Sequence, residues 1–323
     1  MATPASTYAH LSEAQRTFTT PQDFYRLRDF GLKFEATISF LRQHGGNLYR
    51  VLLVPLLVAL VPLILIAVLF AQNFSIDMLQ GQTGSGVSTG MALMIPAFMA
   101  VGLLILAALM VQYVMLYGFV KRRMQQPDPQ VLISAAEAWD EGKRYLLPLL
   151  GYSIIATVLV GLGFLLLALP GIYLAIALVL LPSVVVFEDA DLGGTFSRCL
   201  TLIKGKWWST FGLWFVASMA VGMVSGGVGM VISILGAIVG IKDPNNAVIG
   251  VAVAQAVQMG INFLLYPVLY VLLMFQYFNL VERKDYVSLQ WRAEQLGQTA
   301  GGPAAGSASD DSLFRPSYGD QTL

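Results

Sequence analysis

Residues 145–187 have the sequence YLLPLLGYSIIATVLVGLGFLLLALPGIYLAIALVLLPSVVVF, which contains no charged side chain. A helix of these 43 residues would be about 64 Å long at 1.5 Å per residue. Because a bilayer core is only about 30 Å thick, one helix of this length would overshoot the membrane. Leu169-Pro170-Gly171 lies near the middle, and proline ends or bends a helix. The stretch therefore predicts two membrane spans, 146–169 and 171–187.

Other long stretches of the chain are equally free of Asp, Glu, Lys and Arg. Charged residues make up 12% of the chain, compared with roughly 25% in soluble domains. A charge inside hydrocarbon costs several kcal/mol, so these stretches indicate contact with lipid. The sequence predicts an all-α membrane protein with six transmembrane helices, in a domain of residues 22–285. The predicted spans are 51–71, 91–120, 146–169, 171–187, 207–240 and 247–281.

The distribution of Lys and Arg predicts the orientation of these spans. The predicted spans divide the termini and connecting segments between the two sides of the membrane. Eighteen of the nineteen Lys and Arg residues fall on one side, and only Lys242 falls on the other. Cytoplasmic loops are the ones enriched in Lys and Arg. We therefore expect a multi-pass protein of the lipid bilayer with both termini in the cytoplasm.

Each odd-numbered span is preceded by a segment with helical hydrophobic periodicity. These segments predict three cytoplasmic amphipathic helices, at 23–45, 129–142 and 191–204. Asp128-Pro129 is predicted to begin the second helix, and Asp191 to cap the third. In the first helix the expected apolar face comprises Phe24, Leu27, Gly31, Phe34, Ile38 and Leu41, and the expected polar face Arg26, Lys33, Glu35 and Arg42.

All three segments end in glycine, a polar residue, any residue and an aromatic one. Glycine permits a sharp bend from the membrane surface into the span, and the aromatic ring anchors at the interface. This pattern favours a three-fold repeat of an amphipathic helix plus two spans. The alternative is convergence, since bacterial spans generally favour Lys and Trp at cytoplasmic entries. The three endings are Gly46-Asn47-Leu48-Tyr49, Gly142-Lys143-Arg144-Tyr145 and Gly205-Lys206-Trp207-Trp208.

The third repeat unit carries a resemblance to a known family. It contains Leu181-Pro182, Glu188, Gly193-Gly194-Thr195-Phe196-Ser197-Arg198 and Lys204-Gly205-Lys206-Trp207. In these residues the chain resembles, over about 24–285, a bacterial six-span membrane domain that occurs alone or fused to glycerophosphodiester phosphodiesterases. The resemblance implies a six-span fold in the bacterial cytoplasmic (inner) membrane. It does not imply phosphodiesterase activity, because no soluble segment here is long enough for a barrel of about 250 residues.

The sequence offers little catalytic chemistry. No ionisable acid or base falls within a predicted span, and the motifs of zinc proteases, phosphate loops and nucleophile elbows are missing. His10, His44 and the single Cys199 are too few for a histidine- or cysteine-based metal site. A net charge of zero gives no field that favours nucleic acid. We therefore expect a protein that is not an enzyme, with no cofactor, no metal and no nucleic-acid partner.

Uncharged polar residues within the spans form the first candidate site. Gln255, Gln258, Asn262 and Tyr266 share one face of the sixth span at steps of three and four, and Gln112 lies on the second span. An amide in hydrocarbon is unfavourable unless it is paired, so this face is expected to point into the bundle. It indicates either interhelical hydrogen bonds or a polar path bordered by spans two and six.

The loop between spans four and five forms a candidate structural motif. Acidic residues there precede basic ones, and a contact between a carboxylate and Arg198 would tie the loop helix to the end of span four. Cys199, on the same helix, is expected to report topology by reacting with a membrane-permeant maleimide. The motif comprises Glu188, Arg198, Lys204, Gly205, Lys206 and Trp207.

Residues 1–21 and most of 286–323 have low-complexity compositions that predict disorder. With amphipathic helices on one side only and no catalytic constellation, the sequence favours a protein that scaffolds or regulates membrane or cytoplasmic partner proteins at the cytoplasmic face. The alternative is a carrier or channel for a small or lipid-like solute, which would use Gln255, Gln258 and Asn262.

Overall fold

The computed structural model describes the backbone of residues 12–13, 16–79, 89–240 and 244–300, and the side chains of 12–13, 16–57, 96, 99–100, 102–235 and 257–295. Across these ranges the chain is helical and contains no strand. The helices are α1 (Pro21–Phe24), α2 (Phe30–Leu79), α3 (Thr89–Arg123), α4 (Ala135–Gly142), η4 (Lys143–Tyr145), α5 (Leu146–Leu166), α6 (Ala168–Leu178), α7 (Leu181–Glu188), α8 (Leu192–Ile203), α9 (Trp207–Gly240), α10 (Pro244–Asp285) and α11 (Val287–Ala300).

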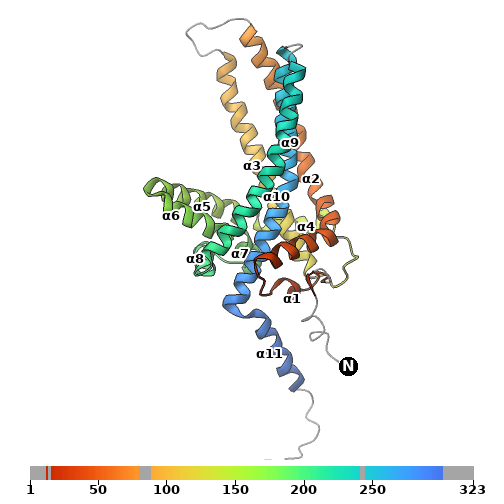
Figure 1. The fold of residues 1–323 in the computed structure, drawn as a ribbon, viewed down its shortest axis with the longest axis vertical. Helices are drawn as coiled ribbons and strands as arrows, with labels where there is room; N and C mark the ends of the chain where they lie inside the picture. Colours follow the sequence, from red (N-terminus) through yellow and green to blue (C-terminus); the bar gives the residue numbers. More distant parts are fainter. Residues whose placement is uncertain (1–11, 14–15, 80–88, 241–243, 301–323) are drawn as a thin grey trace, which may run out of the picture.

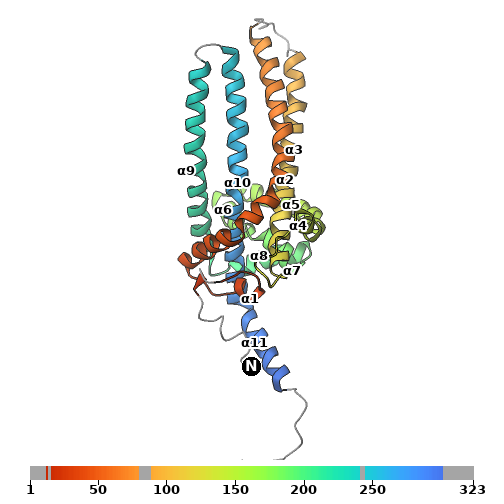
Figure 2. The ribbon, with the colours of Figure 1, turned by 90° about the vertical axis from the view of Figure 1, so that its right-hand side faces the viewer.

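The four longest helices give the molecule its long axis. Figure 2 shows α2 beside α3 and α9 beside α10, and α10 also packs against α2. The chain is a multi-pass membrane protein, since five described segments are long and apolar enough to cross a bilayer. The predicted first span, 51–71, lies in α2, and its side chains from residue 58 are outside the described residues. The five segments are Gly102–Arg123, Ala135–Leu166, Ala168–Glu188, Trp207–Leu235 and Val257–Asp285.

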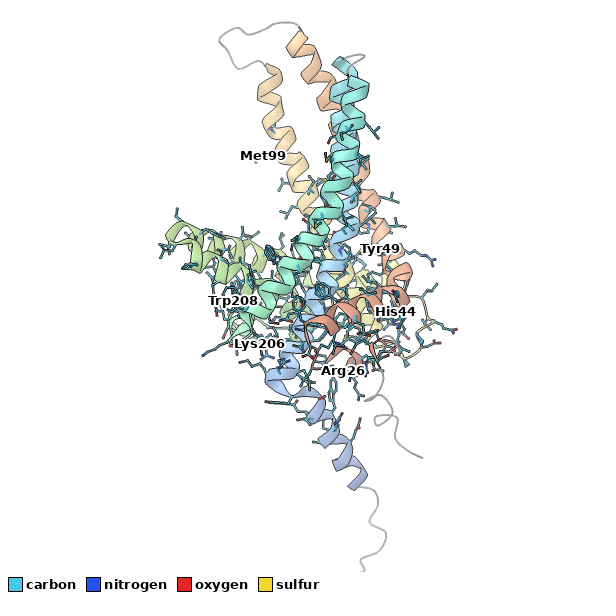
Figure 3. The ribbon with its side chains drawn as sticks, in the orientation of Figure 1. Arg26, His44, Tyr49, Met99, Lys206 and Trp208 are labelled. Atoms are coloured by element: carbon cyan, nitrogen blue, oxygen red, sulfur yellow. The ribbon has the colours of Figure 1, made fainter. Side chains whose placement is uncertain are left out.

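One end of the molecule gathers the short helices and many of the charged side chains. In Figure 3, Arg26, His44 and Lys206 lie in this end, whereas Met99 lies further along α3 toward the opposite end. Helices α1, α4, α8 and α11 are found at the same end (Figures 1 and 2). This arrangement matches the one-sided distribution of Lys and Arg along the sequence.

A phenylalanine cluster forms the core of this end. Phe24 stacks on Phe275 with ring centroids 5.7 Å apart, and Phe18 meets Phe275 edge-on at 5.6 Å. Phe18 is fully buried, so residues 16–21 are packed although we expected 1–21 to be disordered. The reason is that the buried Phe18 ring acts together with the Gln43 and His44 side chains of α2, which hydrogen-bond to backbone carbonyl oxygens of the segment.

The third amphipathic helix has its predicted form, and the second is shorter than predicted. Helix α8 begins after Asp191, whose carboxylate accepts a hydrogen bond from the Gly194 amide at 2.9 Å. Helix α4 begins after Ser134, which forms a capping box with Glu137. The predicted start at Asp128-Pro129 is therefore wrong. The Arg123 guanidinium donates to the carbonyl oxygens of Gln126, Asp128 and Val131 and holds that stretch as a loop.

The first amphipathic segment, predicted at 23–45, is divided between α1 and the beginning of α2. Its face toward the protein carries Lys33, Phe40 and His44, whereas Ile38 is 49% exposed. The predicted apolar face is buried by protein only in part: Phe24 is buried and Phe34 and Leu41 pack against the core, whereas Leu27 and Ile38 are exposed. Exposed apolar side chains on a helix at this end are suited to the membrane interface, so lipid is the medium that would cover Ile38.

The glycine of the recurrent ending plays a different role in each unit. Gly46 lies within α2, and Gly142 has ordinary right-handed helical angles. Gly205 alone of the three has a positive φ, +78°, a conformation that favours glycine. Figure 2 shows that α2 changes direction between its beginning and its long upper part without ending. A glycine-enforced bend is thus present only before α9.

Spans three and four form a helical hairpin whose break lies earlier than predicted. Leu167 adopts extended angles and separates α5 from α6. Pro170 has no amide hydrogen to donate to the Leu166 carbonyl, which favours a break in the helix just before it. The predicted span 171–187 is itself divided into α6 and α7. Figure 1 shows α5 and α6 extending sideways, across the direction of the long helices.

The predicted disordered tail, 286–323, begins with a helix. Helix α11 follows α10 after Tyr286, whose φ is +52°. Residues 301–323 lie outside the described part of the chain.

Candidate functional site

A cavity of about 370 Å³ lies where the α5/α6 hairpin meets α3, α9 and α10. Its wall is mainly apolar, with Leu149 and Leu273 among the lining residues. The polar side-chain groups of the wall are the Trp214 indole and five hydroxyls, those of Tyr113, Tyr266, Tyr270, Ser153 and Thr157.

The three tyrosines form a continuous aromatic group. Tyr113 and Tyr270 have ring centroids 4.1 Å apart and are hydrogen-bonded to one another. Tyr266 stacks on Tyr270 at 5.9 Å, and Tyr113 on Tyr117 at 6.0 Å. Tyr117 continues the polar series, with its hydroxyl 3.2 Å from that of Ser183 on α7. Three stacked or tilted tyrosine rings, Tyr113, Tyr266 and Tyr270, therefore form one part of the cavity wall.

Most of the predicted polar face is used for helix packing. The Gln258 amide donates to the Ser225 hydroxyl, which donates to the Asn262 carbonyl oxygen at 2.5 Å. Gln112 donates to the Phe263 carbonyl oxygen at 2.6 Å. These contacts join α9 to α10 and α3 to α10. Tyr266 is the member of the face that lines the cavity, and the Gln255 side chain lies outside the described residues.

A charged junction joins the ends of α7 and α10 to the middle of α8. Arg198 donates from Nε to the Glu188 carboxylate at 3.0 and 2.7 Å, the contact anticipated from the loop sequence. Its terminal nitrogens donate to Asp285. Burial alone would lower the pKa of Arg198, but the hydrogen bonds that it donates to Asp285 and Glu188 raise it above its ordinary value. The guanidinium therefore stays charged and holds the ends of α7 and α10 against α8.

Tyr25 and Tyr277 extend this junction toward the N-terminal segment. The Tyr277 hydroxyl donates to Glu188 at 2.9 Å, and Tyr25 is hydrogen-bonded to Tyr277. Burial, followed by the nearby Glu188 carboxylate, raises the pKa of Tyr25 to about 12. This phenol is neutral at physiological pH and serves as a hydrogen-bonding group.

A second junction fixes the base of the hairpin. Tyr145, directly before α5, donates to Asp189, directly after α7, at 2.7 Å. Lys121 at the end of α3 donates to the Tyr145 hydroxyl at 2.5 Å and to the Val186 carbonyl oxygen at 2.9 Å. Both ends of the α5–α7 segment are thus attached to the same cation.

The remaining motif residues lie between α8 and α9. Lys204, Gly205 and Lys206 are exposed, and Figure 3 shows Lys206 and Trp208 together at the lower end of α9. The Trp207 indole donates to the Tyr173 carbonyl oxygen at 3.3 Å and stacks on the Tyr173 ring. Trp207 therefore connects α9 to the hairpin.

Sequence reasoning missed the cavity residues Ser153, Thr157 and Tyr270, as well as Asp285. The spacing of four residues between Tyr266 and Tyr270, and between Tyr113 and Tyr117, was the available signal, because such pairs share a helix face. Within the described residues, no group of three or more His, Cys, Asp or Glu side chains is arranged to hold a metal ion. Comparison with protein-family models, curated proteins and solved structures finds no match.

Proposed function

We propose that the protein binds an amphipathic, lipid-like molecule in the cavity between the α5/α6 hairpin and α3/α10. The supporting observation is the composition of the wall, in which apolar side chains surround a short series of tyrosine, serine and threonine hydroxyls. Pockets of roughly 300–1,000 Å³ with few polar groups are typical of small-molecule sites. An acyl chain fits the apolar wall, and a hydroxyl or carbonyl group fits the tyrosines.

The position of the cavity favours a ligand that enters from the lipid. Leu149 in its wall is one helical turn from Tyr145, which contacts Lys121 at the charged end of the molecule. A lipid with its polar group beside Lys121 would therefore extend its chain along the cavity wall. Selective binding of this kind requires no catalytic group, in keeping with our expectation of a protein that is not an enzyme.

Photo-crosslinking in lipid nanodiscs tests the proposal. A phospholipid probe with a photoreactive acyl chain is expected to crosslink to the native protein, and Ala156→Trp, which fills the cavity, is expected to abolish crosslinking at its wall. Ile155→Trp is the matched control, because Ile155 is 39% exposed on the same helix. Gel filtration of both variants checks folding, and Ser153→Leu offers a smaller obstruction. Equal crosslinking of native protein and cavity variants would exclude this function.

A second candidate function is scaffolding of partner proteins by the helices at the charged end. Helix α11 supports it, because it extends away from the bundle (Figure 1). Trp291 packs edge-on against Tyr25 at 5.6 Å, while Leu289 is 55% exposed. Removal of residues 287–300 would abolish co-purification of a partner that binds this helix, whereas partners retained by the shortened chain would argue against it.

A further inference from the structure

The corner of the α5/α6 hairpin differs in composition from the two other segments that connect predicted spans opposite the Lys- and Arg-rich side. Residues 165–171 are LLLALPG and contain no polar side chain, whereas the sequence segments 80–90 and 242–246 contain Gln, Ser, Thr, Lys, Asp and Asn. Leu165, Leu166, Leu167 and Leu169 are 82%, 78%, 69% and 79% exposed. Four leucines with this exposure are not suited to an aqueous loop. The surface therefore fits the acyl chains of the bilayer.

The reach of the hairpin across the bilayer depends on the lengths of its helices and on their direction. Helix α6 has 11 residues and is about 16 Å long, roughly half of a 30 Å hydrocarbon core. Helix α7, which follows it, does not extend the reach, because it is buried at the charged end. There Ser183 lies beside Tyr117, and the Val186 carbonyl accepts from Lys121. Helix α5 has 21 residues and is about 31 Å long, so its length alone would let the corner reach the far surface. The sideways direction of the hairpin in Figure 1 is what keeps the corner short of it.

The backbone of the corner is arranged so that little of it lacks a hydrogen bond. The Leu167 amide donates to the Gly163 carbonyl at 3.0 Å, and the Gly171 amide to the Leu167 carbonyl at 3.5 Å. Pro170 has no amide hydrogen. Gly163 and Gly171 allow close contact of the two helices, since a Cβ on Gly163 would lie 2.9 Å from the Gly171 Cα. Only one residue, Leu167, leaves helical geometry, which limits unpaired backbone in hydrocarbon.

From these observations we infer that α5 and α6 form a re-entrant hairpin. It enters the bilayer from the Lys- and Arg-rich side, turns at Leu167 among the acyl chains and returns to the same side. The sideways direction of the hairpin in Figure 1 agrees with this arrangement. Four helices, α2, α3, α9 and α10, then cross the membrane. The inference does not depend on a ligand in the cavity.

Cysteine accessibility distinguishes a re-entrant hairpin from two full crossings. In a Cys199→Ser background, Leu167→Cys and Asn245→Cys are exposed to a membrane-impermeant maleimide in sealed vesicles of each orientation. Asn245→Cys is expected to react from one side, and Leu167→Cys from neither. Reaction of Leu167→Cys from the same side as Asn245→Cys would show a full crossing and overturn the inference. Its reaction from the other side would place the hairpin in water and overturn it equally.

A spin label separates burial in lipid from simple inaccessibility. A nitroxide on Leu167→Cys is expected to relax faster with dissolved oxygen than with a water-soluble nickel chelate, whereas one on Asn245→Cys should show the reverse. Leu169→Cys, also strongly exposed, provides a second position if Leu167→Cys does not fold. A nitroxide at either corner position that responds mainly to the nickel chelate would contradict the re-entrant arrangement.

Discussion

Arg198 and Asp285 form a two-point ion pair that joins α8 to the end of α10, although 87 positions separate them in the sequence. The same guanidinium binds Glu188, so its loss would release contacts to both α7 and α10. Each of the three side chains is partly buried, with Arg198 24% exposed. Such charge-assisted, bidentate contacts are stronger than ordinary surface pairs.

Arg198→Gln is therefore expected to lower the free energy of unfolding by about 1.5–3 kcal/mol, the usual range for hydrogen bonds to charged groups. Unfolding of the detergent-solubilised protein, followed by intrinsic fluorescence, measures the change. Lys143→Gln is the control, because Lys143 pairs with Asp140 on an exposed helix surface and should change stability by only about 0.3–0.5 kcal/mol. Equal losses in the two variants would show that the junction has no special role.

Lys33 predicts a pH dependence of stability. Burial, followed by the neighbouring Arg283, lowers its pKa from 10.5 to about 8. Between these pH values the unfolded chain still binds a proton that the folded chain has released, so stability rises with pH across this window. The contribution reaches at most about 3 kcal/mol. Below pH 8 both states are protonated, and the unfavourable burial of the charge is present in full.

Comparison of the native protein with Lys33→Met isolates this contribution. The difference in melting temperature between the two is expected to be largest near pH 7, in favour of the variant, and to shrink toward pH 10. Lys204→Met, at an exposed position on the same side, should follow the native profile. A difference between native protein and Lys33→Met that stays constant with pH would contradict the lowered pKa.

Cys199 is expected to resist alkylation in the folded protein. The side chain is fully buried, and burial, followed by the Glu188 carboxylate, raises its pKa to about 12. The reactive thiolate is therefore scarce. This corrects our expectation that a permeant maleimide would label it. Mass spectrometry should detect labelling only after unfolding in dodecyl sulfate, while Thr201→Cys in a Cys199→Ser background, exposed on α8, should react rapidly. Fast labelling of native Cys199 would contradict its burial.

Local features of the fold were predictable from the sequence. Asp191, the range of α8 and the Glu188–Arg198 contact follow from residues close together in the chain. The buried face of α2 was not predictable in the same way. Hydrophobic periodicity shows which side chains avoid water, but it does not show whether lipid or protein covers them. Ile38 and Lys33 exchange their expected roles for this reason.

The direction of the α5/α6 hairpin likewise could not be predicted from the sequence. Composition predicts that 145–187 is apolar and broken by Pro170, but the orientation of α5 and α6 depends on Lys121, Tyr145 and Asp189 meeting at its base. The cavity depends on the same tertiary contacts. Among the described side chains of the predicted polar face, Tyr266 is the one found in its wall, since hydrogen-bond partners such as Ser225 are decided by how the helices pack.

Glycine-to-alanine substitutions on α3 test how closely α4 packs against it. A Cβ on Gly118 would lie 2.2 Å from the Ala138 carbonyl oxygen, and one on Gly142 would lie 2.3 Å from the Val114 carbonyl oxygen. Because these obstacles are backbone atoms, α4 would have to move away from α3. Gly118→Ala is expected to lower the unfolding free energy by about 1–3 kcal/mol, as overpacking generally does.

Gly102→Ala on the same helix is the matched control for Gly118→Ala. A Cβ at Gly102 meets nothing within 4 Å, so alanine should be neutral or should stabilise by up to about 1 kcal/mol through its higher helix propensity. Melting curves from fluorescence-detected gel filtration measure both variants. Opposite signs for the two substitutions would establish close packing of α4 on α3, whereas a neutral Gly118→Ala would mean that α4 lies farther from α3 than the structure has it.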